Sequence, residues 1–229
     1  MFETAINYPR QGEKPWMTIL IGGLLSLFSF LIIPAFIVLG YTIRVLRHTM
    51  EGEEAPPRFA EWGALLVDGL KAFVVLLAYF IVPAIIVGLS VGGVALAAIT
   101  GGEPSLAALG GAFIGLSVAG LLALALWYVA PAGLANFAKT GSLSAAFAVG
   151  ELKQAAFSAS YAKHWALALV VLLIAGALAG ALAATGIGAI LGVFVEFYAL
   201  VVAYYLYARG FDAAMAFEET EAVTGQPAA

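Results

Sequence analysis

Apolar residues gather into five long runs along the chain, and short polar segments separate the runs. They cover Trp16–Val45, Lys71–Thr100, Ser105–Lys139, His164–Ala184 and Ile187–Tyr207. A membrane-spanning helix needs about 20 apolar residues at a rise of about 1.5 Å per residue. Since lipid offers the backbone no hydrogen bonds, such runs must be helical. The pattern predicts an all-α protein, a polytopic helical membrane bundle of five to six membrane segments.

Two polar segments between the runs carry apolar residues at helical spacing, and they predict amphipathic helices at the membrane surface. The first places Phe59 and Trp62 on one apolar face, with charged residues interspersed. The second places Phe147 on an apolar stripe shortly before Glu151. Helices of this kind often rest at the headgroup boundary. The alternative is that each segment is an elbow that packs against its own bundle.

The ten Lys and Arg residues lie outside the apolar runs or at their ends, in a few clusters. They are Arg10, Lys14, Arg44, Arg47, Arg58, Lys71, Lys139, Lys153, Lys163 and Arg209. Cationic loops of membrane proteins stay on the cytoplasmic side. We therefore expect a multi-pass protein of the cell (cytoplasmic) membrane with a cytoplasmic C-terminus and a cytoplasmic N-terminus.

The first run decides the number of membrane segments. If it were one span, the two cations that precede it would lie outside the cell, against the charge rule. A weak internal hairpin repeat offers another answer, because the residues before Trp16 are similar to those before Trp165. We favour a re-entrant hairpin over residues 16–47, broken near Pro34 and covered by protein where its backbone is open. A single kinked span remains the alternative.

The composition places most of the chain in lipid. Of its 229 residues 63% are hydrophobic and 10% are charged, whereas soluble domains average about a quarter charged residues. There is no cysteine and there are two histidines, so we expect no metal site and no cofactor. The net charge of −4 argues against nucleic acid as a partner. We expect one integral membrane domain over residues 1–217 and a mobile acidic tail over 218–229.

Small residues and prolines inside the runs predict how the helices pack and bend. Glycine pairs four residues apart share one helix face and let another backbone approach, here within the chain rather than between copies. These glycines are Gly88, Gly92, Gly111, Gly115, Gly176, Gly180, Gly188 and Gly192. Pro34, Pro83 and Pro131 each lie inside a run and predict a kink. Broken helices also line the sites of transporters, which is the functional alternative to plain bending.

Glu196 is the one carboxyl residue well inside an apolar run. A charge at that depth costs roughly 2.5 kcal/mol or more. The side chain must therefore face the bundle interior, bind a partner or stay protonated. Together with Tyr198 it is a candidate intramembrane ion or proton site. The alternative is a neutral carboxylic acid hydrogen-bonded to a hydroxyl or a free backbone carbonyl.

Enzyme signatures are missing from the sequence, which has no paired carboxylates within one run, no zinc-protease string and no phosphate-binding glycine loop. We expect a small channel or transporter subunit for ions or small solutes, oligomeric and built around Glu196. The alternative is a non-catalytic membrane scaffold that binds a protein partner, not identified by the sequence, through Phe59, Trp62 and Phe147. The lipid bilayer is a partner in both hypotheses.

A motif after the first run carries a family resemblance. It reads Gly40-Tyr41-Thr42-Ile43-Arg44-Val45-Leu46-Arg47, then Gly52, Pro57-x-Phe59 and Trp62, then Asp68-Gly69-Leu70-Lys71. The segment from Glu196-Phe197-Tyr198 to Arg209-Gly210 is similar as well. The chain resembles an uncharacterised archaeal multi-pass membrane family with a domain of unknown function. The resemblance implies an archaeal cell membrane, and the acidic balance is compatible with a haloarchaeon. It implies no reaction and no ligand.

Overall fold

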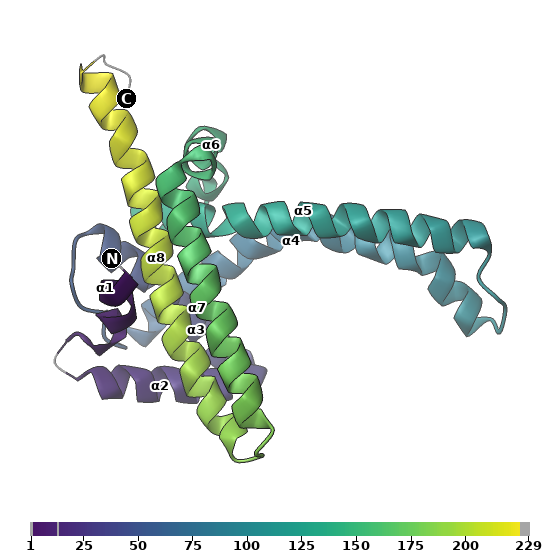
Figure 1. Cartoon of the computed structure of the whole chain (residues 1–229), viewed down its shortest axis with the longest axis horizontal. Coiled ribbons are helices and arrows are strands. Elements are labelled where there is room, and N and C mark those ends of the chain that lie inside the picture. Colours follow the sequence, from purple (N-terminus) through teal and green to yellow (C-terminus); the bar gives the residue numbers. More distant parts are fainter. Residues whose placement is uncertain (1, 13, 225–229) are drawn as a thin grey trace. The chain divides into compact units, whose positions relative to one another are not determined.

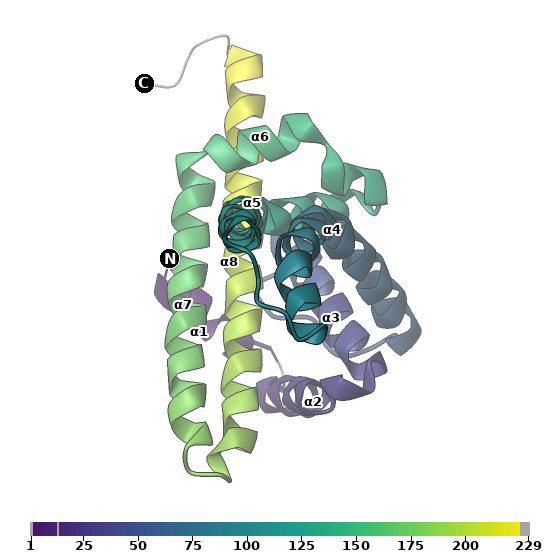
Figure 2. The ribbon, with the colours of Figure 1, turned by 90° about the vertical axis from the view of Figure 1, so that its right-hand side faces the viewer.

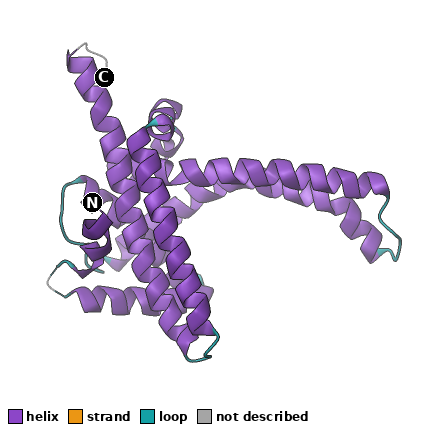
Figure 3. Ribbon diagram, viewed as in Figure 1, coloured by secondary structure: helices purple, strands orange, loops and turns teal. Residues whose placement is uncertain are grey.

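A computed structural model describes residues 2–12 and 14–224, with side chains as far as Ala216. Every regular element in this part of the chain is a helix (Figure 1, Figure 3). The elements are α1 (Phe2–Asn7), η1 (Tyr8–Arg10), α2 (Pro15–Leu27), η2 (Ser29–Leu31), α3 (Ile33–Met50), α4 (Trp62–Ile99), α5 (Leu106–Thr140), η3 (Leu143–Phe147), α6 (Val149–Phe157), α7 (Ala159–Ala183) and α8 (Gly188–Thr224).

Within the described residues, four helices are long and apolar enough to cross a membrane. They are Trp62–Ile99, Leu106–Thr140, Ala159–Ala183 and Gly188–Ala216. This confirms the all-α class and fits a polytopic membrane bundle. The count of five to six membrane segments stays a prediction, because α2 is a shorter apolar helix and α3 is not one of the four candidate spans.

The chain forms two compact units. Unit 2 comprises Val74–Ala130, and unit 1 comprises Met1–Phe73 with Pro131–Ala229. In unit 2, α4 and α5 form a hairpin around Gly101, whose φ of 73° is a conformation that favours glycine. A Cβ at Gly93 would lie 3.8 Å from Ala108 Cβ, so the two helices lie in contact near the turn. The predicted domain over residues 1–217 thus comprises parts of both units.

The centre of unit 1 is the helix pair α7 and α8, which lie side by side along their length (Figure 1, Figure 2). Helices α2 and α3 both pack against α8, and the N-terminal helices α1 and η1 also contact it. The short helix α6 packs on α7 and α8. Helix α8 therefore forms the axis to which the rest of unit 1 is attached.

The first apolar run forms two helices and not one. Helix α2 has 13 residues and α3 has 18, so they are about 20 Å and 27 Å long. Between them Ile32 has a φ of 63° and a ψ of −58°, which breaks the helix. The segments outside the two helices, Lys14–Pro15 and Ala55–Arg58, line one common pocket. The run therefore forms two helices separated by a sharp break at Ile32, and not one continuous helix.

The prolines have different places in the structure. Pro34 lies in the first turn of α3, where a missing N–H leaves no hydrogen bond unmade. It therefore follows the break at Ile32, and it does not kink a continuous helix. Pro83 lies inside α4 and Pro131 inside α5, and both helices continue past them. Pro131 is also the first residue of α5 that belongs to unit 1.

The prediction of two separate surface helices is half wrong. Trp62 is the first residue of α4, so the amphipathic segment after it is the beginning of a membrane-length helix. Phe59 lies in the loop before α4, stacked on the ring of Tyr41 at 4.1 Å between centroids. The sequence pattern contained no stop signal after Phe73, and the apolar periodicity runs on into the span. The second segment does form short separate helices, η3 and α6.

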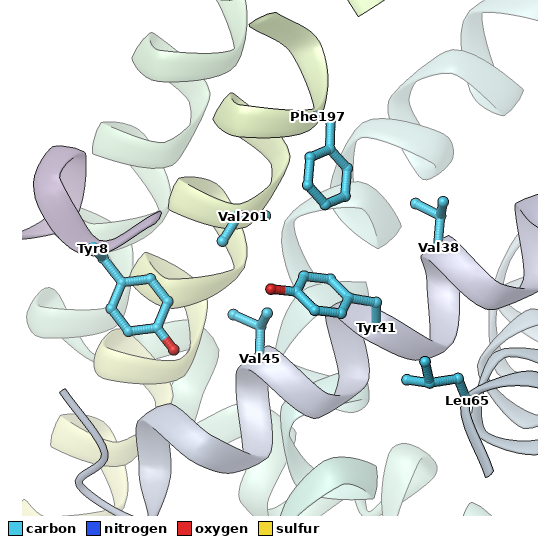
Figure 4. Packing of buried hydrophobic residues seen from close by; sticks show 7 residues of the cluster. All are labelled: Tyr8, Val38, Tyr41, Val45, Leu65, Phe197 and Val201. Carbon is cyan, nitrogen blue, oxygen red and sulfur yellow. The ribbon is translucent and has the colours of Figure 1, made fainter. Parts of the chain in front are cut away.

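The core of unit 1 lies between α3, α8 and the N-terminal segment. Figure 4 shows the ring of Tyr41 between α3 and α8, with Val45, Val201 and Phe197 around it. Tyr8 enters the same cluster from η1 and is 1% exposed. Helix α8 continues to Thr224, and residues 225–229 of the predicted mobile tail lie outside the described residues.

Candidate functional site

Glu196 lines an open groove between three helices of unit 1. The groove has a volume of about 410 Å³ and is formed by α2, α7 and α8. Ser26 from α2 and Gly176 from α7 lie on its walls, and Phe197 and Leu200 from α8 complete them. The side chain of Glu196 is exposed. It therefore does not point into a closed bundle interior.

Within the part of the chain that the structure describes, the Glu196 carboxylate makes no hydrogen bond and no ion pair. The expected bond to a hydroxyl or a free carbonyl is not formed there. An ionised carboxylate in an apolar membrane groove is costly unless a cation joins it. The volume of the groove leaves room for a cation beside the Glu196 carboxyl group.

Tyr198 does not share the groove with Glu196. Its hydroxyl donates a hydrogen bond to the Ile6 carbonyl oxygen, which joins α8 to α1. Two residues of helix turn the side chain by about 200°, so the two groups face in nearly opposite directions. The structure thus separates the predicted pair, and Tyr198 anchors the N-terminal segment.

Two arginines of α3 hold the loop before α4 and the end of α5. Arg44 is buried, donates to the Ala60 carbonyl oxygen at 2.8 Å and lies 3.3 Å from the Glu61 carboxylate. Arg47 donates from Nε to the Ala138 carbonyl oxygen at 3.1 Å and lies 3.4 Å from the Asp68 carboxylate. These cations of the family-like motif therefore have structural partners.

Tyr8 fastens the N-terminal segment to the other end of the same loop. Its hydroxyl donates to the Ala55 carbonyl oxygen at 3.4 Å and accepts from the Thr49 hydroxyl at 3.4 Å. Its ring lies 4.4 Å from that of Tyr205 on α8. Burial raises the pKa of the Tyr8 phenol to about 12, although the bond from Thr49 acts in the opposite direction.

Two smaller pockets are both lined by Arg209 of α8. One, of about 320 Å³, includes Thr49, Glu53 and Glu54, and the other, of about 340 Å³, includes His164. The Nδ1 atom of His164 lies 2.7 Å from the Ser160 carbonyl oxygen. Because a carbonyl oxygen only accepts, Nδ1 carries the hydrogen. In the described part of the chain, no group of three or more His, Cys, Asp or Glu residues could hold a metal ion.

Two of the eight predicted glycines mark a close contact between helices of the chain. A Cβ at Gly115 would overlap the Ser90 side chain, and one at Gly192 would lie 3.2 Å from Ala179. A Cβ at Gly188 would overlap the Leu182 carbonyl oxygen, within the turn between α7 and α8. A Cβ at any of the other five would meet no atom of the described residues within 4 Å. They are Gly88, Gly92, Gly111, Gly176 and Gly180.

The helix crossing in which backbone meets backbone uses glycines that the spacing rule missed. A Cβ at Gly40 would overlap the Leu65 carbonyl, and one at Gly69 would overlap the Phe36 carbonyl, so α3 and α4 cross backbone to backbone. Gly22 and Gly23 likewise admit two phenylalanine rings of α8. The sequence contained two signals for these contacts. One is the adjacent pair Gly22 and Gly23 in an apolar segment, and the other is the pair of glycines in the Gly40-Tyr41 and Asp68-Gly69 motif.

Comparison with known proteins places the chain in a family. None of the curated proteins and none of the solved structures matches it. One family description, "Protein of unknown function (DUF4013)", matches residues 27–184. The match contains the second half of the hairpin, the α3–α4 crossing and the helices α4 to α7. It covers more than half of the chain, and this protein belongs to the DUF4013 family of proteins of unknown function.

Proposed function

We propose that this chain is a subunit of a small membrane channel or transporter for ions or small solutes, and that Glu196 binds the transported cation or proton. The observation that carries the proposal is an exposed carboxyl that has no partner among the described residues, in a groove of about 410 Å³ between α2, α7 and α8. Intramembrane carboxyl groups of this kind commonly mark ion and proton pathways.

We also propose that α2 and α3 enter and leave the membrane on one side. The residues at their junction are apolar and exposed, as a lipid-immersed tip requires: Phe30 is 74% exposed and Ile32 65%. Ser26, one turn before the break, lines the Glu196 groove. Transporters often place an ion site next to such interrupted helices.

Three contacts support a cytoplasmic location for both termini. Tyr8 packs on Tyr205, the end of α5 accepts a hydrogen bond from Arg47, and Gln154 Nε2 donates to the Ala214 carbonyl oxygen at 3.0 Å. They join segments from five parts of the sequence, namely η1, α3, α5, α6 and α8, that contain or adjoin the cationic clusters. The turn over residues 184–187, between α7 and α8, carries no charge. A cell membrane of an archaeon with a salty cytoplasm suits this charge pattern and the net charge of −4.

The test is a flux assay with purified protein in liposomes, using pH-sensitive and cation-sensitive dyes. We expect flux above that of empty liposomes, and we expect Glu196→Gln to abolish its dependence on pH. Glu151→Gln is the matched control, because Glu151 is an exposed carboxyl of the short helix α6. Absence of flux across protons, alkali cations and small solutes contradicts the proposal, as does an equal effect of the two substitutions.

The oligomer that we propose uses the open glycine face of α7. Gly176 and Gly180 lie one turn apart, and a Cβ added at either would meet no atom of the described residues within 4 Å. Such a face lets a helix of a second copy approach closely. Since Gly176 also lines the groove, that copy would cover Glu196 from the lipid side.

A scaffold without transport activity is the second candidate function. Trp62 and Phe147 favour it, because they are 46% and 42% exposed although both lie in unit 1 near the cationic segments. Phe59, which the sequence placed on the same surface, is not part of it, because its ring stacks on that of Tyr41. A scaffold predicts no flux in the liposome assay and loss of co-purifying protein when Trp62 and Phe147 become Ser. Either candidate is a non-enzymatic role.

A further inference from the structure

A third pocket of unit 1 combines positive charge with an apolar wall. It has a volume of about 410 Å³ and lies between the start of α2 and the loop that follows α3. Lys14, Arg58 and Gln11 supply polar groups, and Met17, Ile21 and Phe59 supply apolar surface. It shares no lining residue with the Glu196 groove.

Two cationic side chains line this pocket. The side chains of Lys14 and Arg58 are both exposed, and they come from segments that the hairpin brings together. None of the described lining residues is Asp or Glu. The nearby residues Glu53 and Glu54 line the separate pocket beside Arg209. Glu13 lies outside the described residues. A lysine and an arginine on one pocket match an anion such as a phosphate group.

The apolar wall continues beyond the pocket along α2. Met17 is 37% exposed and Leu20 44%, and the exposure continues to Leu24 and Phe28 at the hairpin tip. Trp16, next to the pocket, is 61% exposed, as is typical of a tryptophan at the boundary between headgroups and acyl chains. A ligand that fits this surface has an anionic head and a long apolar tail.

We infer that this pocket binds one anionic phospholipid, with the phosphate between Lys14 and Arg58 and an acyl chain along Met17 and Ile21. A free phosphate would use only the cationic half. A zwitterionic lipid would add an ammonium group that the two cations repel. The inference does not depend on transport through the Glu196 groove, because the two sites are separate.

The test is native mass spectrometry of the detergent-purified protein with phosphatidylglycerol as the probe and phosphatidylcholine as the comparison lipid. We expect one retained phosphatidylglycerol per chain and much weaker retention of phosphatidylcholine. Each basic side chain near anionic lipid contributes roughly five-fold to affinity. Lys14→Gln should weaken binding about five-fold, and Lys14→Gln with Arg58→Gln about 30-fold.

The matched control is Lys139→Gln with Lys153→Gln, which removes the same charge from two exposed lysines elsewhere in unit 1. We expect it to leave the affinity unchanged, and circular dichroism checks that each variant is folded. An equal loss in the control pair would show attraction by net charge only and would overturn the site. Displacement of the lipid by millimolar inorganic phosphate would identify a free anion as the occupant and would overturn the lipid assignment. If the double variant does not fold, Lys14→Gln alone decides the outcome.

Discussion

The crossing of α3 and α4 predicts a large cost for a single methyl group. Ala at position 40 would place its Cβ over the Leu65 carbonyl and 2.9 Å from the Gly69 backbone nitrogen. Overpacking of this kind costs about 1–3 kcal/mol, and the upper end applies because backbone cannot rotate away. Ala gains about 1 kcal/mol over Gly in helix propensity. We therefore expect Gly40→Ala to lower the free energy of unfolding by about 2 kcal/mol.

For a chain of this size such a loss corresponds to a fall in Tm of about 4–8 °C. The assay is thermal unfolding in detergent, followed by helical circular dichroism. Gly120→Ala is the matched control, because a Cβ at Gly120, inside α5, would meet no atom of the described residues within 4 Å. It should keep or raise the Tm. If Gly40→Ala unfolds at the same temperature as Gly120→Ala, the backbone contact described above does not exist.

Two further predictions concern the polar contacts of unit 1. The folded-state pKa of Tyr8, about 12, lies above the ordinary value of about 10. Its stabilising contribution is therefore complete below pH 10 and is lost as pH rises towards 12. Tyr8→Phe should lower the Tm at pH 8 and remove that alkaline decline, and parallel curves from pH 8 to 12 would contradict the prediction. Asp68→Asn should leave the partly buried Arg47 without its ion pair, and a double-mutant cycle with Arg47→Gln should give a coupling energy of about 1 kcal/mol. A coupling of zero would mean that the 3.4 Å pair contributes nothing.

The helices were predictable because lipid offers the backbone no hydrogen bonds, so a long apolar run must be helical. Four runs became the four candidate spans, and the hairpin reading of the first run followed from two cations that a single span would place on the wrong side. The boundary of α4 was missed because an amphipathic stretch and an apolar stretch share one helical period. The sequence between Trp62 and Ile99 contains no residue that requires the helix to end there.

The candidate site was only partly predictable. Glu196 stands out by its depth in an apolar run, but which side of α8 faces a groove depends on where α2 and α7 pack. Tyr198, two residues later, lies on the other side for the same geometrical reason. The glycine spacing found the contacts at Gly115 and Gly192 but missed the crossing at Gly40 and Gly69, because it describes one helix, whereas a crossing depends on two helices that meet at a shared point.

The bond between Tyr198 and Ile6 joins residues 192 positions apart. Ribosomes add about 5–20 residues per second, so the N-terminal segment waits for about 10–40 s before its partner emerges. During that time α2 and α3 have left the translocation machinery without the helix that covers Gly22 and Gly23. Any chain released before α8 is made lacks this cover and leaves the apolar surface at Gly22 and Gly23 without its partner helix.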